Sequence, residues 1–166
     1  MNRFNKLAAA PIALYVQQKL TTEKAEAKAK PNWLESAHAN IPHWEKAHRG
    51  GEDAWICTDS LIAVADGVGG WNKKGIDPGI FARELCRRVL STYEARTERR
   101  FEVDMWELLV QNVKRTEAPG SSTFVMALMD EEDTLLRTLN LGDSAVMIVR
   151  TNAEGKLDIK FRSEEK

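Results

Sequence analysis

Short apolar runs bounded by turn residues predict that the folded part of the chain begins near Ala54. The segments AWICT (54–58) and SLIAVA (60–65) are brief and apolar, which is typical of buried strands. Asp59 and Ser60 separate them with two turn-forming residues. The pattern therefore predicts an antiparallel hairpin whose outer ends lie side by side.

Helical spacing follows the hairpin in two segments. Residues 76–95 predict a helix with Asp77 as N-cap and Pro78 at the first helical position. Its expected buried face comprises Ile80, Phe81, Leu85, Val89 and Tyr93. Residues 103–117 predict a second helix, with Trp106, Leu109, Val110 and Val113 facing inward.

After the helices the pattern returns to strand-like runs with short turns between them. The four candidates are residues 121–130, 133–142, 144–152 and 156–162. Consecutive strands joined by short turns predict an antiparallel meander. Two strands, two helices and four strands together indicate the α+β class, with helices packed on antiparallel sheet.

The N-terminal residues 1–30 read differently from the rest. Residues 1–22 carry Arg3, Lys6 and Lys19 without any acidic residue, a charge pattern compatible with a mitochondrial import presequence. A single arginine, no serine and Pro11 favour the alternative, a disordered or docking arm. Residues 21–30 are interpreted as a linker, and 31–166 as the folded unit.

Composition narrows the functional classes. Lys and Arg total 24 and Asp and Glu total 25, so the formal charge of -1 gives no global attraction to nucleic acid. No apolar run is long enough to span a bilayer. Cys57 and Cys86 lie in apolar segments and form no disulfide framework, which favours an intracellular compartment: the cytoplasm unless the N-terminus directs import.

Acidic residues beside glycine mark the outer ends of the predicted hairpin. Glu52 and Asp53 precede its first strand, and Asp66 ends its second. Pairing would bring the Glu52 and Asp66 carboxylates together, where they repel unless a proton or cation lies between them. Mg²⁺ and Mn²⁺ prefer such oxygen ligands, and Gly67 could lend its backbone carbonyl. The alternative is an ordinary Asp-Gly turn with a solvated acid.

Five segments in order resemble the metal-dependent protein phosphatases of the protein phosphatase 2C family. They are GGEDAW, VADGVGGW, GIDPGIFARELCR, GSST and NLGDSAV, spread over about residues 41 to 163. The pairing of ADGVGGW with GIDP is most similar to the organellar branch of the family. The resemblance implies a β-sandwich of two antiparallel sheets flanked by helices.

The same resemblance implies a serine/threonine phosphatase with a binuclear Mg²⁺ or Mn²⁺ centre and a metal-bridging hydroxide as nucleophile. By position, Glu52, Asp66 and the Gly67 carbonyl match its metal ligands. Asp53 matches the acid that orders metal-bound water, and Asp143 matches an acid of a further, weaker metal site. Arg49 is the candidate for holding substrate phosphate. Asp66, Asp53 and Arg49 are the expected catalytic residues, and a phosphoprotein is the expected substrate.

Two departures from the family pattern shape the expectation for this chain. Family enzymes continue well beyond the position of Lys166 and carry further metal aspartates there, so weaker metal binding and reduced turnover are expected of the chain as given. Val68 stands where many members have a histidine. A non-catalytic, phosphatase-like binding module and a small α/β interaction domain remain alternatives. The sequence leaves open the substrate protein, the choice of Mg²⁺ or Mn²⁺, and the oligomeric state.

Overall fold

A four-stranded antiparallel sheet forms the centre of the computed structural model, which describes residues 15–17, 34–98, 103–129 and 135–164. Its strands, in the order in which they pair, are β3 (Asp53–Cys57), β4 (Leu61–Asp66), β5 (Phe124–Met129) and β6 (Leu136–Leu141). The predicted hairpin is present, because β3 pairs with β4 across the turn at residues 58–60. Strand β4 is buried along its length except for Asp66 at its end.

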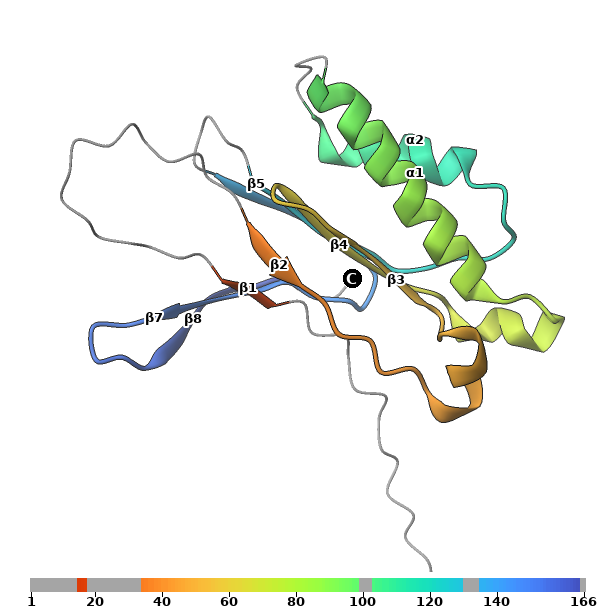
Figure 1. Ribbon diagram of the computed structural model, residues 1–166, viewed down its shortest axis with the longest axis horizontal. Coiled ribbons are helices and arrows are strands. Elements are labelled where there is room, and N and C mark those ends of the chain that lie inside the picture. Colours follow the sequence, from red (N-terminus) through yellow and green to blue (C-terminus); the bar gives the residue numbers. More distant parts are fainter. Residues whose placement is uncertain (1–14, 18–33, 99–102, 130–134, 165–166) are drawn as a thin grey trace, which may run out of the picture.

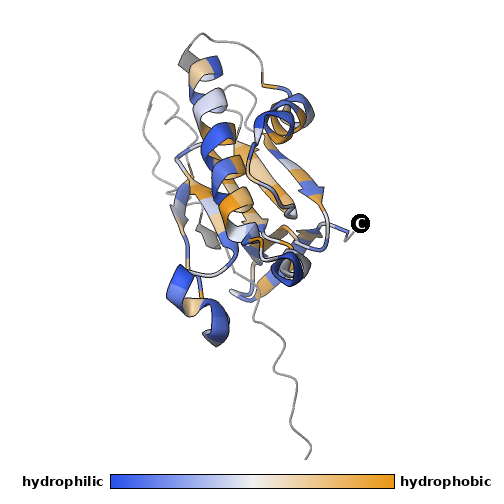
Figure 2. Ribbon diagram, turned by 90° about the vertical axis from the view of Figure 1, so that its right-hand side faces the viewer, coloured by the Kyte–Doolittle hydropathy of each residue, from blue (hydrophilic) through white to orange (hydrophobic). Residues whose placement is uncertain are grey.

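Both helices cover one face of this sheet (Figure 1). Helix α1 (Pro78–Glu98) begins at the predicted N-cap, where the Asp77 carboxylate accepts a hydrogen bond from the Gly79 amide at 3.0 Å. Helix α2 (Met105–Arg115) begins in the same way at Asp104. The apolar layer between helices and sheet is the main core (Figure 2). Each large side chain buried there contributes about 1.5 to 3 kcal/mol.

The inward faces of the helices differ in part from the periodicity prediction. Leu85, Val89 and Tyr93 are buried as expected, but Ile80 is exposed. In α2 the prediction was wrong for Trp106 and Val113, which are exposed. The buried positions of α2 are Leu108, Leu109 and Asn112. Two overlapping apolar stripes fit the same helical spacing, and the packing of α2 against α1 selects the one containing Leu108.

Two further pairs of strands lie on the side of the sheet away from the helices (Figure 1). The first joins β1 (Tyr15–Gln17) to β2 (Glu35–Ala37), and the second joins β7 (Met147–Thr151) to β8 (Leu157–Arg162). The predicted four-strand meander is therefore wrong between β6 and β7, which belong to different sheets. The intervening loop starts at Gly142, whose φ of 101° turns the chain out of the sheet.

The α+β class, with antiparallel sheet flanked by helices, is confirmed. Apart from β1, the predicted N-terminal arm at residues 1–30 lies outside the described residues. Cys57 and Cys86 are both free thiols, and burial raises the pKa of Cys86 to about 12. None of the described helices combines the length and apolar character needed to cross a bilayer.

Two short 3₁₀ helices complete the description and flank the outer end of the hairpin. They are η1 (Trp44–Arg49), which precedes β3, and η2 (Gly69–Lys74), which follows β4. Together with the start of α1 they surround the acidic residues that the sequence singled out.

Candidate active site

The register of the hairpin places Asp53, rather than the predicted Glu52, directly opposite Asp66. Their carboxyl groups are within hydrogen-bonding reach of each other. Partial burial and the nearby Asp66 charge raise the pKa of Asp53 to about 6. The pKa of Asp66 is also raised, chiefly by desolvation, although its side chain reaches the surface. Two carboxylates this close favour a proton or a cation between them.

The chain after Asp66 is held by the GSST segment, Gly120–Thr123. The Thr123 amide donates to the Asp66 carbonyl at 2.9 Å, and the Val68 amide donates to the Ser121 carbonyl at 2.9 Å. The Trp71 indole donates to the Ser121 hydroxyl at 2.8 Å. The GSST motif thus fixes both ends of the Asp66–Trp71 turn, a role that the sequence did not reveal.

Gly67 is required by close packing. A Cβ at this position would lie 2.7 Å from the Glu52 carbonyl oxygen and 2.9 Å from the Pro78 carbonyl oxygen. The Gly67 amide donates to that same Glu52 carbonyl at 3.1 Å. Any larger residue would push apart β3, β4 and the start of α1, which is where the acidic side chains are positioned.

Glu52 precedes Asp53 in the chain, but its carboxylate faces different partners. Its side chain is 6% exposed and forms ion pairs with Lys46 and with Arg49, the latter at 2.9 Å. The Asn72 amide donates to the same carboxylate at 2.5 Å. Cations of the protein itself therefore balance much of the Glu52 charge, and the remainder contributes to the raised pKa values of Asp53 and Asp66.

Arg49 connects Glu52 to the start of α1. Its Nη2 atom donates to Glu52 and also to the Asn72 side-chain oxygen at 2.8 Å, and its Nη1 atom lies 3.7 Å from the Asp77 carboxylate. The Nε atom of Arg49 is buried and has no hydrogen-bond partner among the described residues. The arginine predicted to hold phosphate is thus mostly engaged with protein groups, with one donor left over.

Asp143 lies in the exposed loop after β6. Its negative charge contributes to the raised pKa of Asp66, so the two acids are close enough to interact. The loop is tied to the acid pair by a hydrogen bond of 2.7 Å between the hydroxyls of Thr123 and Ser144. Asp143 is therefore a neighbour of the acid pair without being part of it.

A divalent cation would find oxygen donors at this end of the hairpin. Asp53 and Asp66 provide two carboxylates whose mutual repulsion it would relieve, and Gly67 is the adjacent backbone. Mg²⁺ commonly binds through one or two carboxylates and keeps several waters, so this donor set fits it. Within the described ranges, no three His, Cys, Asp or Glu residues are grouped to hold a metal together.

Lys46, Asn72 and Asp77 belong to the site electrostatically but were not among the residues predicted from the sequence. Lys46 and Arg49 are three residues apart in the charged turn before Glu52, a spacing that directs both cations to one side. That spacing was a usable signal for Lys46. Asn72 had no such signal, because only the fold brings η2 beside η1.

Comparison with known proteins identifies the class. No protein-family model matches the chain. It is 38% identical over 121 residues to "Probable protein phosphatase 2C BIPP2C1" of Oryza sativa subsp. japonica, covering 70% of this chain and 20% of that protein. It is 30% identical over 168 residues to "Protein phosphatase PTC7 homolog fig" of Drosophila mojavensis, covering 91% of this chain and 52% of that protein.

A solved phosphatase structure is also similar to this chain. The X-ray structure of the photosystem II phosphatase PBCP superposes with a TM-score of 0.64 at 29% identity, covering 76% of this chain and 47% of that one. The fold and sequence are thus those of a phosphatase-like α+β protein. The chain is homologous to the protein phosphatase 2C family, of which the curated relatives named above are members. It spans between 20% and 52% of the length of those two relatives.

Proposed function

We propose that this chain carries part of the active site of a Mg²⁺- or Mn²⁺-dependent phosphatase that hydrolyses phosphoserine and phosphothreonine esters in proteins. The observation that carries the proposal is the Asp53–Asp66 pair, two hydrogen-bonded carboxyl groups with raised pKa values at the end of a buried hairpin. The curated relatives are named as protein phosphatases, which supports the same reaction class.

Asp66 and Asp53 would hold the cation, with the Gly67 backbone as a further donor. When bound, a divalent ion in such a site supplies a nucleophile from water near neutral pH and neutralises charge on the phosphoryl group. The chain's own contribution is position: the hairpin register and the GSST segment fix both carboxylates before any ligand arrives.

The remaining residues divide the other tasks. Asp53, whose carboxyl group neighbours that of Asp66, would orient a water by accepting its hydrogen bond when deprotonated. Arg49 lines the same groove as Asp53, so its guanidinium would add positive charge near a phosphoryl group bound at the acid pair. Val68 is exposed beside the acid pair and has no proton to give, so the leaving alkoxide would take its proton from water.

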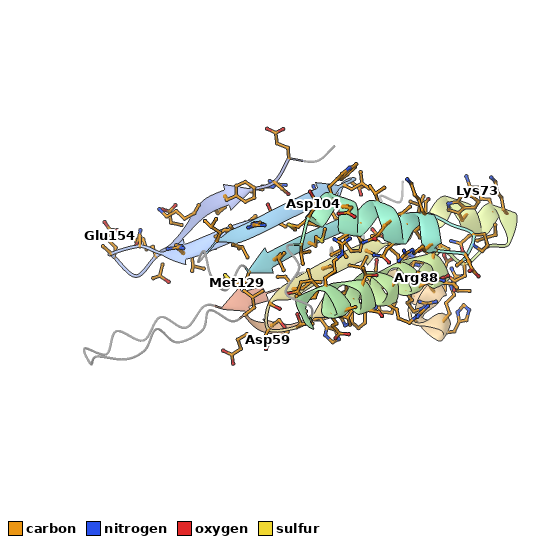
Figure 3. The ribbon with its side chains drawn as sticks, turned by 90° about the horizontal axis from the view of Figure 1, so that it is seen from above. Asp59, Lys73, Arg88, Asp104, Met129 and Glu154 are labelled. Atoms are coloured by element: carbon orange, nitrogen blue, oxygen red, sulfur yellow. The ribbon has the colours of Figure 1, made fainter. Side chains whose placement is uncertain are left out.

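The test compares two Asp→Asn variants of the same hairpin. Hydrolysis of p-nitrophenyl phosphate and of a phosphothreonine peptide is measured with Mn²⁺ and with excess EDTA. Wild-type turnover is expected to require Mn²⁺, and Asp66→Asn should reduce it at least about 100-fold because the cation loses a charged ligand. Asp59→Asn is the matched control, since Asp59 lies in the turn at the opposite end of the hairpin from Asp66. Figure 3 shows Asp59 far from Lys73, which belongs to η2, the short helix that follows Asp66.

Full turnover in EDTA, or equal turnover in the Asp66 and Asp59 variants, would remove the proposal. Mn²⁺ binding by calorimetry on the same proteins shows whether a loss of turnover arises at the metal site. Wild-type and Asp59→Asn proteins should bind Mn²⁺ equally, and Asp66→Asn should bind it far more weakly.

A non-catalytic binding module is the second candidate, and the Glu52 environment favours it. With Glu52 neutralised by Lys46 and Arg49, the described residues leave only an acid pair for a cation. Such a module would bind phosphorylated protein without turnover. Binding of a phosphopeptide with no phosphate release under saturating Mn²⁺ would support this candidate against the phosphatase.

A further inference from the structure

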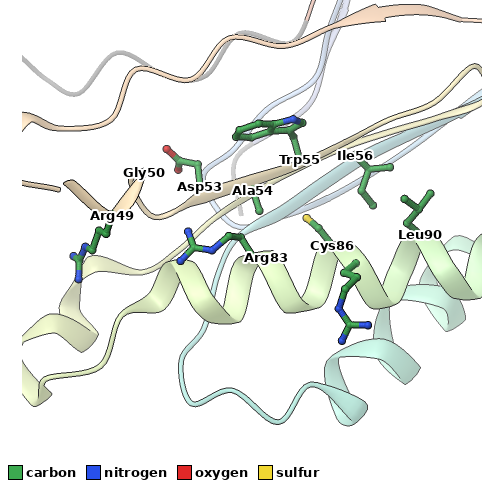
Figure 4. A pocket seen from close by; sticks show the side chains of 10 residues that line it. Arg49, Gly50, Asp53, Ala54, Trp55, Ile56, Arg83, Cys86 and Leu90 are labelled. Carbon is green, nitrogen blue, oxygen red and sulfur yellow. The ribbon is translucent and has the colours of Figure 1, made fainter. Parts of the chain in front are cut away.

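An open groove runs from the candidate active site along helix α1. It has a volume of about 540 Å³ and starts at Asp53 (Figure 4). Ala54, Ile56, Cys86 and Leu90 provide an apolar floor between β3 and the helix. Arg49, Arg83 and Arg87 line it as well, and among the described residues of the lining Asp53 is the only acidic one.

The edge of β3 that borders this groove is available for pairing. Strand β3 is the outermost strand of the sheet in the described part of the chain. Hydrogen bonds from Gly67 to the Glu52 carbonyl and from Thr58 to the Leu61 carbonyl show that even-numbered residues of β3 bond to β4. The backbone groups of Asp53, Trp55 and Cys57 therefore point toward the open edge, where an extended peptide could add as a strand.

The charge of the groove is positive and partly uncompensated. Arg83 makes two long contacts of 3.4 Å, to the Asp77 carboxylate and the Gly51 carbonyl. Arg87 is exposed, and within the described residues it has neither a hydrogen bond nor an ion pair. Arg83 and Arg87 are one helical turn apart, about 6 Å along the axis. Alternate side chains of an extended peptide are separated by about 6.6 Å, which matches that spacing.

We propose that this groove binds the acidic stretch next to the phosphorylated residue of a protein substrate. The segment lies extended along β3, with carboxylates at alternate positions facing Arg83 and Arg87 and with its phosphorylated residue at the Asp53–Asp66 pair. The inference rests on the proposed function, because it takes the phosphoprotein as the ligand of that site. It adds the substrate class: sites flanked by Asp or Glu.

The test uses fluorescence anisotropy with labelled peptides that differ only in charge. Two phosphothreonine peptides carry either Glu or Gln at alternate flanking positions, and each has an unphosphorylated twin. In EDTA and low salt, wild-type protein is expected to bind the Glu peptides about tenfold more tightly than the Gln peptides. Arg87→Gln should reduce this preference about threefold, and Arg87→Glu should abolish it.

Arg150→Gln is the matched control, because Arg150 is an exposed arginine on the β7–β8 pair, away from the groove. It should leave the preference unchanged. Equal affinity for the Glu and Gln peptides would overturn the proposal, as would equal effects of the Arg87 and Arg150 substitutions. The proposal would also be overturned if sedimentation showed a concentration-dependent dimer that does not bind the peptides. In that case a second copy of the chain would occupy the groove.

Binding and turnover fail separately in this design. The preference is measured without metal and also on the unphosphorylated peptides, so it does not depend on hydrolysis. A retained preference for the Glu peptides with no Mn²⁺-dependent phosphate release would contradict the proposed phosphatase function but not the proposed binding of acidic peptides in the groove. Turnover at equal KM for the Glu and Gln peptides would contradict the proposed binding of acidic peptides in the groove but not the proposed phosphatase function.

Discussion

Glu52 and the Asp53–Asp66 pair lie at the same end of one hairpin but have opposite electrostatic surroundings. Glu52 is buried among two cations and an amide, so its charge is balanced before any ligand binds. Asp53 and Asp66 face one another, and their pKa values are raised. A strand alternates its side chains between two faces, so consecutive residues meet different partners. Glu52 therefore stabilises the fold through its ion pairs. Asp53 and Asp66 instead repel each other, and a bound cation would relieve that repulsion.

Removing the Glu52 charge should have the largest effect on stability. Glu52→Gln removes the anionic partner of Lys46 and leaves Arg49 with the more distant Asp77, which is expected to cost about 2 to 3 kcal/mol of unfolding free energy. Urea unfolding in EDTA measures this cost. Glu94→Gln, an exposed glutamate on α1, is the control and should change the unfolding free energy by less than about 0.5 kcal/mol. Equal stability of both variants would show that the ion pairs at Glu52 contribute nothing.

Lys46 links the two acidic regions, and its removal should strengthen metal binding. Its ammonium group pairs with Glu52, and its charge also lowers the pKa values of Asp53 and Asp66. It therefore supplies part of the positive charge that a divalent ion would otherwise provide. Lys46→Met should tighten Mn²⁺ binding about tenfold in calorimetry, since a cation within several ångströms of the site is lost.

Lys73→Met is the control for that measurement, because Lys73 is exposed on η2 and its charge does not contribute to the pKa shift of either acid. Its Mn²⁺ affinity should remain near that of the wild type. Unchanged affinity in the Lys46 variant would mean that the ammonium group and the metal do not compete.

Neutralising Asp53 should stabilise the metal-free protein, the opposite of the result at Glu52. Asp53→Asn removes repulsion with Asp66, and an increase of about 1 kcal/mol in unfolding free energy is expected in EDTA, since solvent screens this half-exposed pair. Urea unfolding near pH 7 measures it, with Asp59→Asn as control. A loss of stability in the Asp53 variant would contradict the contrast between Glu52, whose charge is compensated by cations, and Asp53, whose charge is repelled by Asp66.

The sequence predicted the hairpin, both helices and the acids at the strand ends because each has a local signal. Asp77 before Pro78 fixes the start of α1, and the apolar run ending at Asp66 fixes the end of β4. What Glu52 contacts could not be predicted in the same way. Its partners come from η1 and η2, which meet only in three dimensions. The break between β6 and β7 also lacked a signal, since its loop resembles an ordinary hairpin turn.

Asp143 should give the smallest effect, because it acts on the acid pair only through its charge. It lies in an exposed loop, where solvent screens much of its interaction with Asp66. Asp143→Asn is therefore expected to weaken Mn²⁺ binding about two- to threefold in low salt, and less in 0.5 M NaCl, without altering urea unfolding. Glu154→Gln, on the distant β7–β8 turn, removes the same charge and should leave Mn²⁺ affinity unchanged. A loss in the Asp143 variant as large as in Asp66→Asn would instead make Asp143 a direct ligand, and the acid pair would then be a triad.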